Sequence, residues 1–151
     1  MTRVQSLLDR LCWGLVHSFP YRHKLVYTDG EKYLLRFYLK RNGILPGLYL
    51  HKFFQGDQDR ELHDHPWSRS LSFILTGGYD EERLINGEVK TRRVRPGMFN
   101  YIKGTSFHRV SLVDEAGGAW TIFCSGPKVK GWGFRYEDGT VVPSEEYLKN
   151  H

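Results

Sequence analysis

The sequence predicts a mainly β fold, a sandwich or barrel of antiparallel strands with a helix at each end. Three observations predict it. Short extended runs, several of them alternating apolar and polar residues, recur from about residue 24 to residue 136. Turn-forming pairs that contain glycine separate most of these runs. Aromatic residues, which favour strands, make up 15% of the chain. Short strands joined by such turns are typical of sandwiches and barrels.

The first predicted element is a helix within residues 1–20. Apolar residues recur there at three- and four-residue spacings, which places them on one helix face, and Pro20 would end the helix. The apolar residues are Val4, Leu7, Leu8, Leu11, Leu15 and Phe19. We expect this face to pack against the sheet. A membrane-surface role is the alternative, and the low positive charge of the opposite face argues against it.

The strands are expected to follow in order, beginning with a hairpin. Its strands cover residues 24–28 and 32–40 and are joined at the pair Asp29-Gly30. Further strands are expected at 47–54, 70–75, 81–86, 88–94, 99–102, 107–113, 119–125 and 132–136. Ser144 then caps a short C-terminal helix, with Glu145 and Glu146 at the positive end of its dipole.

Length, charge and cysteine content limit the classes of protein to which the chain can belong. A chain of 151 residues suits a single domain, 1–151. Its net charge of +5 comes from basic residues scattered along the predicted strands, so nucleic acid is not the expected partner. Cys12 and Cys124 form no CxxC pair, which fits a reducing compartment. No apolar segment approaches the length of a membrane span. We therefore expect a cytoplasmic protein without a membrane association.

The candidate site is centred on two histidines in the stretch ELHDHPW, residues 61–67. Residues i and i+2 of a strand point to the same side, so His63 and His65 project together and Asp64 projects away. A third histidine, His108, follows in TSFHRVSL and again enters a predicted strand after a glycine turn. Three imidazoles suit a divalent metal. A pair of histidines in a polar loop is the plainer interpretation.

These segments resemble the two sequence motifs of the cupin superfamily. The first motif corresponds to GDQDRELHDHPWSRSLSFILTG, where Gly77 is in place and Ser70 stands where the motif has glutamate. The second corresponds to YIKGTSFHRVSL, where Leu112 stands where the motif has asparagine. The resemblance covers roughly residues 47–126 and implies an antiparallel jelly-roll barrel of the cupin type, with both helices outside the motifs.

The resemblance also implies a metal centre. It assigns His63, His65 and His108 as ligands without a carboxylate, which is similar to the three-histidine iron subgroup that includes the thiol dioxygenases. Cysteine dioxygenases likewise carry an HDH pair. Fe(II) is therefore the expected metal, and Zn, Ni or Mn are alternatives. The stretches ELHDHPW, GGY and SGPKVKGWGFR resemble small cupin proteins of phage and bacterial genomes.

Three neutral ligands leave the charge of a divalent metal uncompensated, which favours a small anionic substrate such as a thiolate, an enolate or a carboxylate. The expected function is a three-histidine non-haem iron dioxygenase. One alternative is a metal-dependent isomerase or lyase, which would need no dioxygen. Another is a non-catalytic module that holds a ligand in its cavity. No catalytic residue is assigned beyond the ligands, and a homodimer is an option that the edge strands leave open.

Strand parity selects the residues expected around the metal. Counting from Ser70 and His108 places Ser72, Ile74, Val110 and Leu112 inside the barrel, which predicts a mostly apolar cavity. The pocket candidates are Tyr49, His51, Ser70, Trp120, Cys124 and Arg69. His51 is either a fourth nitrogen ligand or a hydrogen-bonded, half-buried residue, and Cys124 is either near the metal or a small buried apolar residue.

Charged residues near the histidine pair complete the prediction. Asp64 and Glu61 are expected to bind imidazole N–H groups and fix the ring tautomers, with solvent-facing or capping roles as the alternative. The arginines that would bind a substrate carboxylate are Arg60, Arg69 and Arg109. Trp67 is expected over the mouth of the cavity. The segment 128–135 is expected to pack Trp132 and Phe134 into the sandwich, with a phosphate or base contact as the alternative.

Overall fold

The computed structural model describes residues 3–18, 22–28, 30–39, 47–57, 61–114 and 116–150. Within these ranges, helix α1 (Arg3–Ser18) comes first and helix α2 (Ser144–Asn150) last. The strands between them are β1 (His23–Thr28), β2 (Glu31–Tyr38), β3 (Leu48–Phe53), β4 (Leu62–His63), β5 (Arg69–Thr76), β6 (Tyr79–Ile85), β7 (Glu88–Val94), β8 (Phe99–Lys103), β9 (His108–Leu112), β10 (Ala119–Ser125), β11 (Gly133–Arg135) and β12 (Val141–Pro143). Neither helix has the length and hydrophobicity needed to cross a bilayer.

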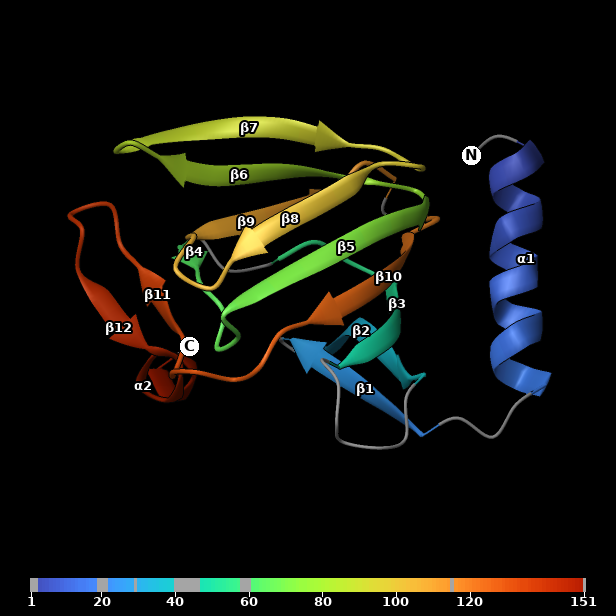
Figure 1. Cartoon of the computed structure of the whole chain (residues 1–151), viewed down its shortest axis with the longest axis horizontal. Helices are drawn as coiled ribbons and strands as arrows, with labels where there is room; N and C mark the ends of the chain where they lie inside the picture. The colour runs from blue at the N-terminus through green and yellow to red at the C-terminus, as the bar shows by residue number, and fades with distance from the viewer. Residues whose placement is uncertain are drawn as a thin grey trace.

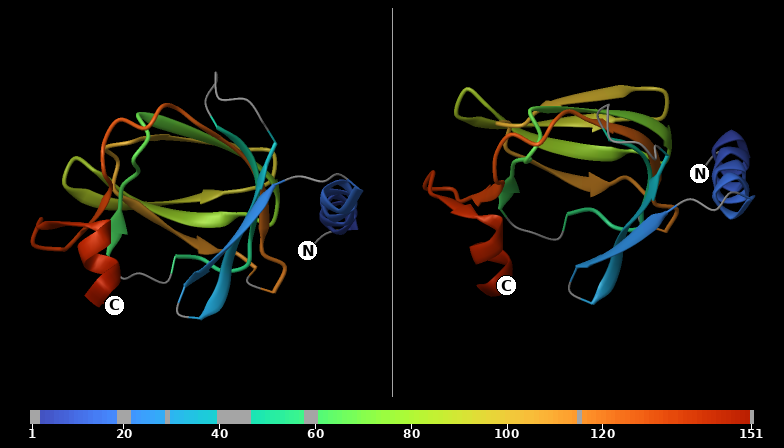
Figure 2. Two further views of the ribbon diagram at one scale, coloured as in Figure 1. Left: turned by 90° about the horizontal axis from the view of Figure 1, so that it is seen from below. Right: turned by 60° about the horizontal axis from the view of Figure 1, so that its bottom comes forward.

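The strands form two six-stranded antiparallel sheets. The first has the order β1-β2-β3-β10-β5-β8 and the second the order β12-β11-β4-β9-β6-β7. Both sheets curve around a common interior, with α1 and α2 outside on opposite sides (Figures 1 and 2). The predicted fold class, a mainly β antiparallel jelly-roll barrel with a helix at each end, is confirmed.

Most strand positions agree with the predicted ones to within two residues, and two strands were missed. Strands β4 and β12 are two and three residues long, too short to show an alternating pattern. Between β6 and β7, Asn86 and Gly87 both have positive φ angles, 53° and 83°, as a two-residue hairpin turn requires. Phe19, Pro20, Asp29 and Lys40, which belong to predicted boundaries, lie outside the described residues.

The predicted orientation of the N-terminal helix is wrong. The apolar side chains of its expected inner face are largely exposed: Val4 by 67%, Leu7 by 57%, Leu11 by 58% and Leu15 by 44%. The opposite face contacts the sheet. Asp9 accepts hydrogen bonds of 2.8 Å from Lys52 Nζ and Trp120 Nε1. Because Lys52 is buried and its charge needs a partner, the Asp9 ion pair fixes the rotation of α1.

Apolar residues form two clusters, one on each side of the first sheet. Between α1 and the outer face lie Val16, Phe37, Leu50 and Trp120. Inside the barrel lie Ile74, Tyr79, Val94 and Val110. Both faces of β2, β3 and β10 are therefore covered, the outer face by α1 and the inner face by the opposite sheet.

Candidate functional site

Local strand pairing brings the three predicted histidines together. His63 on β4 lies directly opposite His108 on β9 in the antiparallel register. His65 follows β4, and its backbone N–H donates to the carbonyl of Gly104 at 3.3 Å. A Cβ atom at residue 104 would lie 1.8 Å from the carbonyl oxygen of Trp67, so only glycine allows the His65 loop to pack this closely.

The ring nitrogens of these histidines converge on one point. His65 Nε2 and His108 Nε2 are 2.8 Å apart. One ligand nitrogen from each of the three rings lies within 4.8 Å of the other two. Two nitrogens bound at about 2.0–2.1 Å to one metal, at roughly right angles, would lie about 3 Å apart. The spacing of His65 and His108 fits a shared metal ion.

Glu81 supports this cluster, and sequence analysis missed it. Its Oε1 lies 2.8 Å from His108 Nδ1, and the side chain is almost completely buried on β6. A carboxylate accepts, so His108 Nδ1 carries the hydrogen and Nε2 presents a lone pair to the cluster. The available signal was the pair Glu81-Glu82 in a predicted strand, where alternation must turn one of two neighbouring acids inward.

A buried polar network holds Glu81 in place. Arg83 Nη2 donates to both of its carboxylate oxygens at 2.8 and 2.9 Å, and Asn100 Nδ2 donates at 3.0 Å. Burial alone would raise the pKa of Glu81, but the hydrogen bond and charge of His108, with the bonds from Arg83 and Asn100, lower it to about 2. The Tyr79 hydroxyl stays uncharged, because burial raises its pKa to about 12.

Burial favours the neutral form of His63 and His65. Burial lowers the pKa of His63, and the neighbouring charge of His108 adds to this while Asp57 and Asp64 oppose it. Burial lowers the pKa of His65 further, and the charges of His108, His63, Lys130 and Arg36 act in the same direction. His63 Nδ1 is buried and has no hydrogen-bond partner in the described part of the chain, and it lies 3.9 Å from Asp57 Oδ2. Neutral rings with free lone pairs are the form that binds metals.

The histidines open into a cavity of about 450 Å³ inside the barrel. Trp67, Phe123 and Trp132 form part of its wall, and the Trp67 ring stacks on His65 with centroids 5.6 Å apart. The lining is mostly apolar, as predicted, and it also contains charged groups that the prediction did not include. Strands β1 and β2, outside the two sequence motifs, contribute Lys24, Tyr33 and Arg36 to the lining, and Asp57 adds an acid.

His51 lies in the same cavity but outside the three-histidine cluster. Its Nε2 accepts a hydrogen bond of 3.0 Å from Arg36 Nε, and burial, followed by the charge of Arg36, lowers its pKa well below the ordinary value. The ring stacks on both Tyr49 and Phe123. Ser70 and Ser72 are buried on the inner side of β5, where Ser72 lines the cavity and Ser70 Oγ has no hydrogen-bond partner among the described residues.

Two predicted pocket residues lie on the wrong side of β10. Trp120 is fully buried in the cluster under α1, and Cys124 shares its face, so neither lines the cavity. Thr121 and Phe123 take the inward positions, and a register irregularity separates Trp120 from Thr121. Because both faces of β10 are covered, its apolar residues do not reveal which face is inward.

The charged residues expected beside the histidines also have other roles. Asp64 binds Lys130 Nζ and accepts from the Gly133 N–H at 2.9 Å, and it has no imidazole partner among the described residues. Glu61 accepts from Tyr147 Oη at 2.5 Å. Arg69 is exposed on the outer face of β5, opposite Lys103. Arg60 lies outside the described residues.

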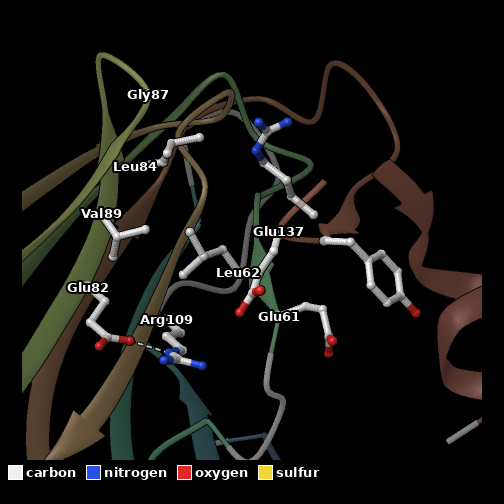
Figure 3. Close-up of a pocket in the computed structure, with 10 residues that line it drawn as sticks. Glu61, Leu62, Glu82, Leu84, Gly87, Val89, Arg109 and Glu137 are labelled. Atoms are coloured by element: carbon white, nitrogen blue, oxygen red, sulfur yellow. Dashed lines mark hydrogen bonds and ion pairs between the residues drawn. The ribbon is translucent and has the colours of Figure 1, made fainter. Parts of the chain in front are cut away.

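Glu61 and Arg109 line a second cavity of about 300 Å³, on the outer face of the second sheet (Figure 3). Arg109 forms an ion pair there with Glu82, and Glu137 also lines the cavity (Figure 3). His63, His65 and His108 do not line this cavity. The tautomer role predicted for Asp64 and Glu61 therefore falls to Glu81 at His108.

The segment after β10 packs against the histidine loop. The N–H groups of Val129 and Lys130 donate to the carbonyl of Pro66, and Trp67 pairs with Lys128 in an isolated bridge. Trp132 reaches the cavity, with its ring centroid 6.1 Å from that of His63. Phe134 is buried and stacks on Tyr147, as expected of a residue that packs into the sandwich.

The solved structures similar to this chain are cupin-fold proteins. Fe(II) HppE matches with a TM-score of 0.57 and 14% identity, over 70% of this chain and 56% of that one. An oxalate decarboxylase matches with a TM-score of 0.57 and 12% identity, over 87% of this chain and 32% of that one. The hydroxypropylphosphonic acid epoxidase of S. wedmorenis matches with a TM-score of 0.51 and 15% identity, over 80% and 73%.

The chain thus spans about half the length of Fe(II) HppE and a third of the decarboxylase. The sequence matches no protein-family model and is not detectably similar to any curated protein. At such low identities the structural likeness establishes the fold, and the fold is that of the cupins.

Proposed function

We propose that this cupin-fold chain is a metal-dependent enzyme, in which His63, His65 and His108 hold one divalent metal ion. The observation that carries the proposal is the convergence of His65 Nε2 and His108 Nε2 at 2.8 Å, with a nitrogen of His63 within 4.8 Å of both. The hydrogen bond from His108 Nδ1 to Glu81 supports it, because this bond leaves Nε2 free to bind the metal.

The finer proposal is an Fe(II)-dependent dioxygenase that acts on a small anion. Three histidines without a carboxylate are the donors in the cluster, and one protein of similar fold is named as an Fe(II) form. A bound Fe(II) ion would supply dioxygen activation beside the substrate. Zn, Ni or Mn in its place would support a lyase or isomerase.

The side chains around the cluster define what can react there. A cavity of about 450 Å³ suits a small molecule. Trp67 and Trp132 cover the histidines with aromatic rings and limit the access of water. Glu81 fixes the orientation of His108, and the buried network of Arg83 and Asn100 fixes Glu81. The protein would thereby hold substrate and metal in a preorganised site.

The first test is the metal content of protein purified without chelator or histidine tag, measured by mass spectrometry. About one metal ion per chain is expected, and His65→Ala should lose most of it, because two remaining ligands bind far more weakly than three. His17→Ala is the matched control, since His17 is exposed on α1. Full metal content in a folded His65→Ala variant would contradict the proposal.

The second test separates the reactions. Protein loaded with Fe(II) should consume dioxygen in an oxygen electrode when the right thiol or other small anion is added. Turnover that proceeds without dioxygen would favour the isomerase or lyase. Metal-free protein that is folded and still binds small anions would favour the non-catalytic module.

A further inference from the structure

Two cations face each other at the cavity, on the hairpin of β1 and β2, where Arg36 is half-buried and Lys24 is exposed. Lys24 and Arg36 are directly opposite in the antiparallel register, and both line the cavity. The pair two positions further along the hairpin, Val26 and Leu34, also lines the cavity. Alternate residues of both strands therefore face the cavity, as expected for a hairpin with one face turned inward. Like charges directly opposite each other destabilise a pair of strands. An anion bound between Lys24 and Arg36 would remove this cost.

No carboxylate of the described residues neutralises either cation. Lys24 and Arg36 form no ion pair with a carboxylate in the part of the chain that the structure describes. The acid that lines the cavity, Asp57, accepts hydrogen bonds from Tyr33 Oη at 2.6 Å and from the Val110 N–H at 2.7 Å. Its two oxygens are therefore occupied by other donors.

Arg36 is held in a fixed orientation. Its Nε donates to His51 Nε2 at 3.0 Å, and its guanidinium lies over the Tyr49 ring, 5.0 Å from the centroid. These contacts use Nε and one face of the group, and they leave both terminal nitrogens for a ligand. Because His51 accepts at Nε2, its Nδ1 carries a hydrogen, and this buried donor has no acceptor among the described residues.

We propose that Lys24 and Arg36 bind a doubly charged oxyanion of the phosphate class on the substrate. This inference rests on the proposed function, because it places the reacting end of the substrate at the three histidines. A guanidinium matches such an oxyanion through paired hydrogen bonds, and an ammonium adds a compact positive charge. The subsite and the three histidines line the same cavity.

The charge of the whole cavity favours a dianion over a monoanion. Lys24, Arg36 and Asp57 line the cavity, and with a divalent metal their charges leave an excess of three positive charges. Glu81 does not reduce this excess, because Arg83 pairs with it. A phosphate dianion would offset more of the excess than a single carboxylate would.

The test is the binding of inorganic phosphate at about pH 8, with acetate as the monoanion, by isothermal titration calorimetry. Phosphate should bind more tightly than acetate. Arg36→Gln and Lys24→Gln should each weaken phosphate binding about tenfold or more, because each removes a charged hydrogen-bond donor. Arg36→Lys should fall between wild type and Arg36→Gln, since it keeps the charge and loses the paired donors.

The chain supplies a matched control. Arg69 and Lys103 form another cross-strand pair of an arginine and a lysine, on the outer face of the first sheet. The double variant Arg69→Gln/Lys103→Gln makes the same change in net charge as Arg36→Gln/Lys24→Gln and should keep wild-type phosphate affinity. Equal losses in the two double variants, or equal affinities for phosphate and acetate, would overturn the proposal.

Titrations of metal-free and metal-loaded protein separate this proposal from the proposed function. Phosphate binding that depends on Lys24 and Arg36 in both forms supports the subsite even if the metal proposal fails. Metal content that stays near one ion per chain in Arg36→Gln/Lys24→Gln, with unchanged phosphate affinity, would refute the subsite and leave the metal centre intact. Circular dichroism confirms that each variant is folded.

Discussion

At the scale of single residues, Glu81 determines how the candidate metal centre is oriented. It is buried against His108 Nδ1 and held by Arg83 and Asn100. Histidine ligands usually donate their second N–H to such an acceptor, which fixes the tautomer and raises the basicity of the ligand nitrogen. The cupin motif has its glutamate elsewhere, where this chain has Ser70. The Glu81 carboxylate thus contacts His108, which is one of the three proposed metal ligands, and is not itself a member of the three-histidine cluster.

We predict that Glu81→Gln weakens metal binding about 10- to 100-fold, because the amide has one oxygen acceptor in place of a charged carboxylate. The dissociation constant is measured by competition with a chelator of known affinity. Glu82→Gln is the matched control, since Glu82 faces outward and pairs with Arg109. If Glu81→Gln and Glu82→Gln bound metal equally well, Glu81 would have no part in positioning His108.

At the scale of elements, α1 packs on the barrel through a polar contact and turns its apolar stripe outward. Asp9 binds the buried Lys52 and the indole of Trp120, and Val16 is the buried apolar residue of the helix. The same element covers the outer face of the first sheet and so determines that Trp120 belongs to the core and not to the cavity.

We predict that Asp9→Ala lowers the free energy of unfolding by roughly 3 kcal/mol, because it leaves the buried charge of Lys52 without a carboxylate and with only the Gly117 carbonyl as acceptor. Leu11→Ala should change it by about 0.5 kcal/mol or less, since Leu11 is 58% exposed. Urea unfolding followed by circular dichroism measures both. A larger loss for Leu11→Ala than for Asp9→Ala would mean that the apolar stripe, and not Asp9, holds the helix.

At the scale of the whole molecule, one barrel buries several histidines in their neutral form. Burial lowers the pKa of His51, His63 and His65, with neighbouring positive charge adding to the effect. Below the ordinary histidine pKa of about 6.5, the unfolded chain binds protons that these rings resist in the folded state. Folding stability is therefore complete above that pH and is lost as the pH falls.

We predict that metal-free protein loses stability between pH 7.5 and pH 5.5, by up to about 1.4 kcal/mol per pH unit for each such histidine in the range where only the unfolded chain is protonated. Urea unfolding at several pH values measures the slope. His65→Gln should flatten it, and His17→Gln, on the exposed side of α1, should leave it as in the wild type. A stability independent of pH in this window would contradict the prediction.

The sequence by itself determined most of the strands, the turns between them and the three histidines. Alternation and turn residues are local properties, and the HxH spacing needs only one extended segment to point two rings the same way. The strand that contains His108 could be predicted from the sequence in the same way.

Only the tertiary structure decided which faces turn inward and which charges meet. Period-two alternation divides a strand into two faces without saying which is inside, so Trp120 and Cys124 were placed in the wrong layer. Glu81 reaches His108 across 27 residues, and Arg36 reaches His51 across 15, through strand pairings that no local pattern encodes. The rotation of α1 about its axis followed from the buried Lys52, whose charge requires Asp9 as a partner. This requirement outweighed the burial of the apolar stripe, so the leucines of α1 remain exposed.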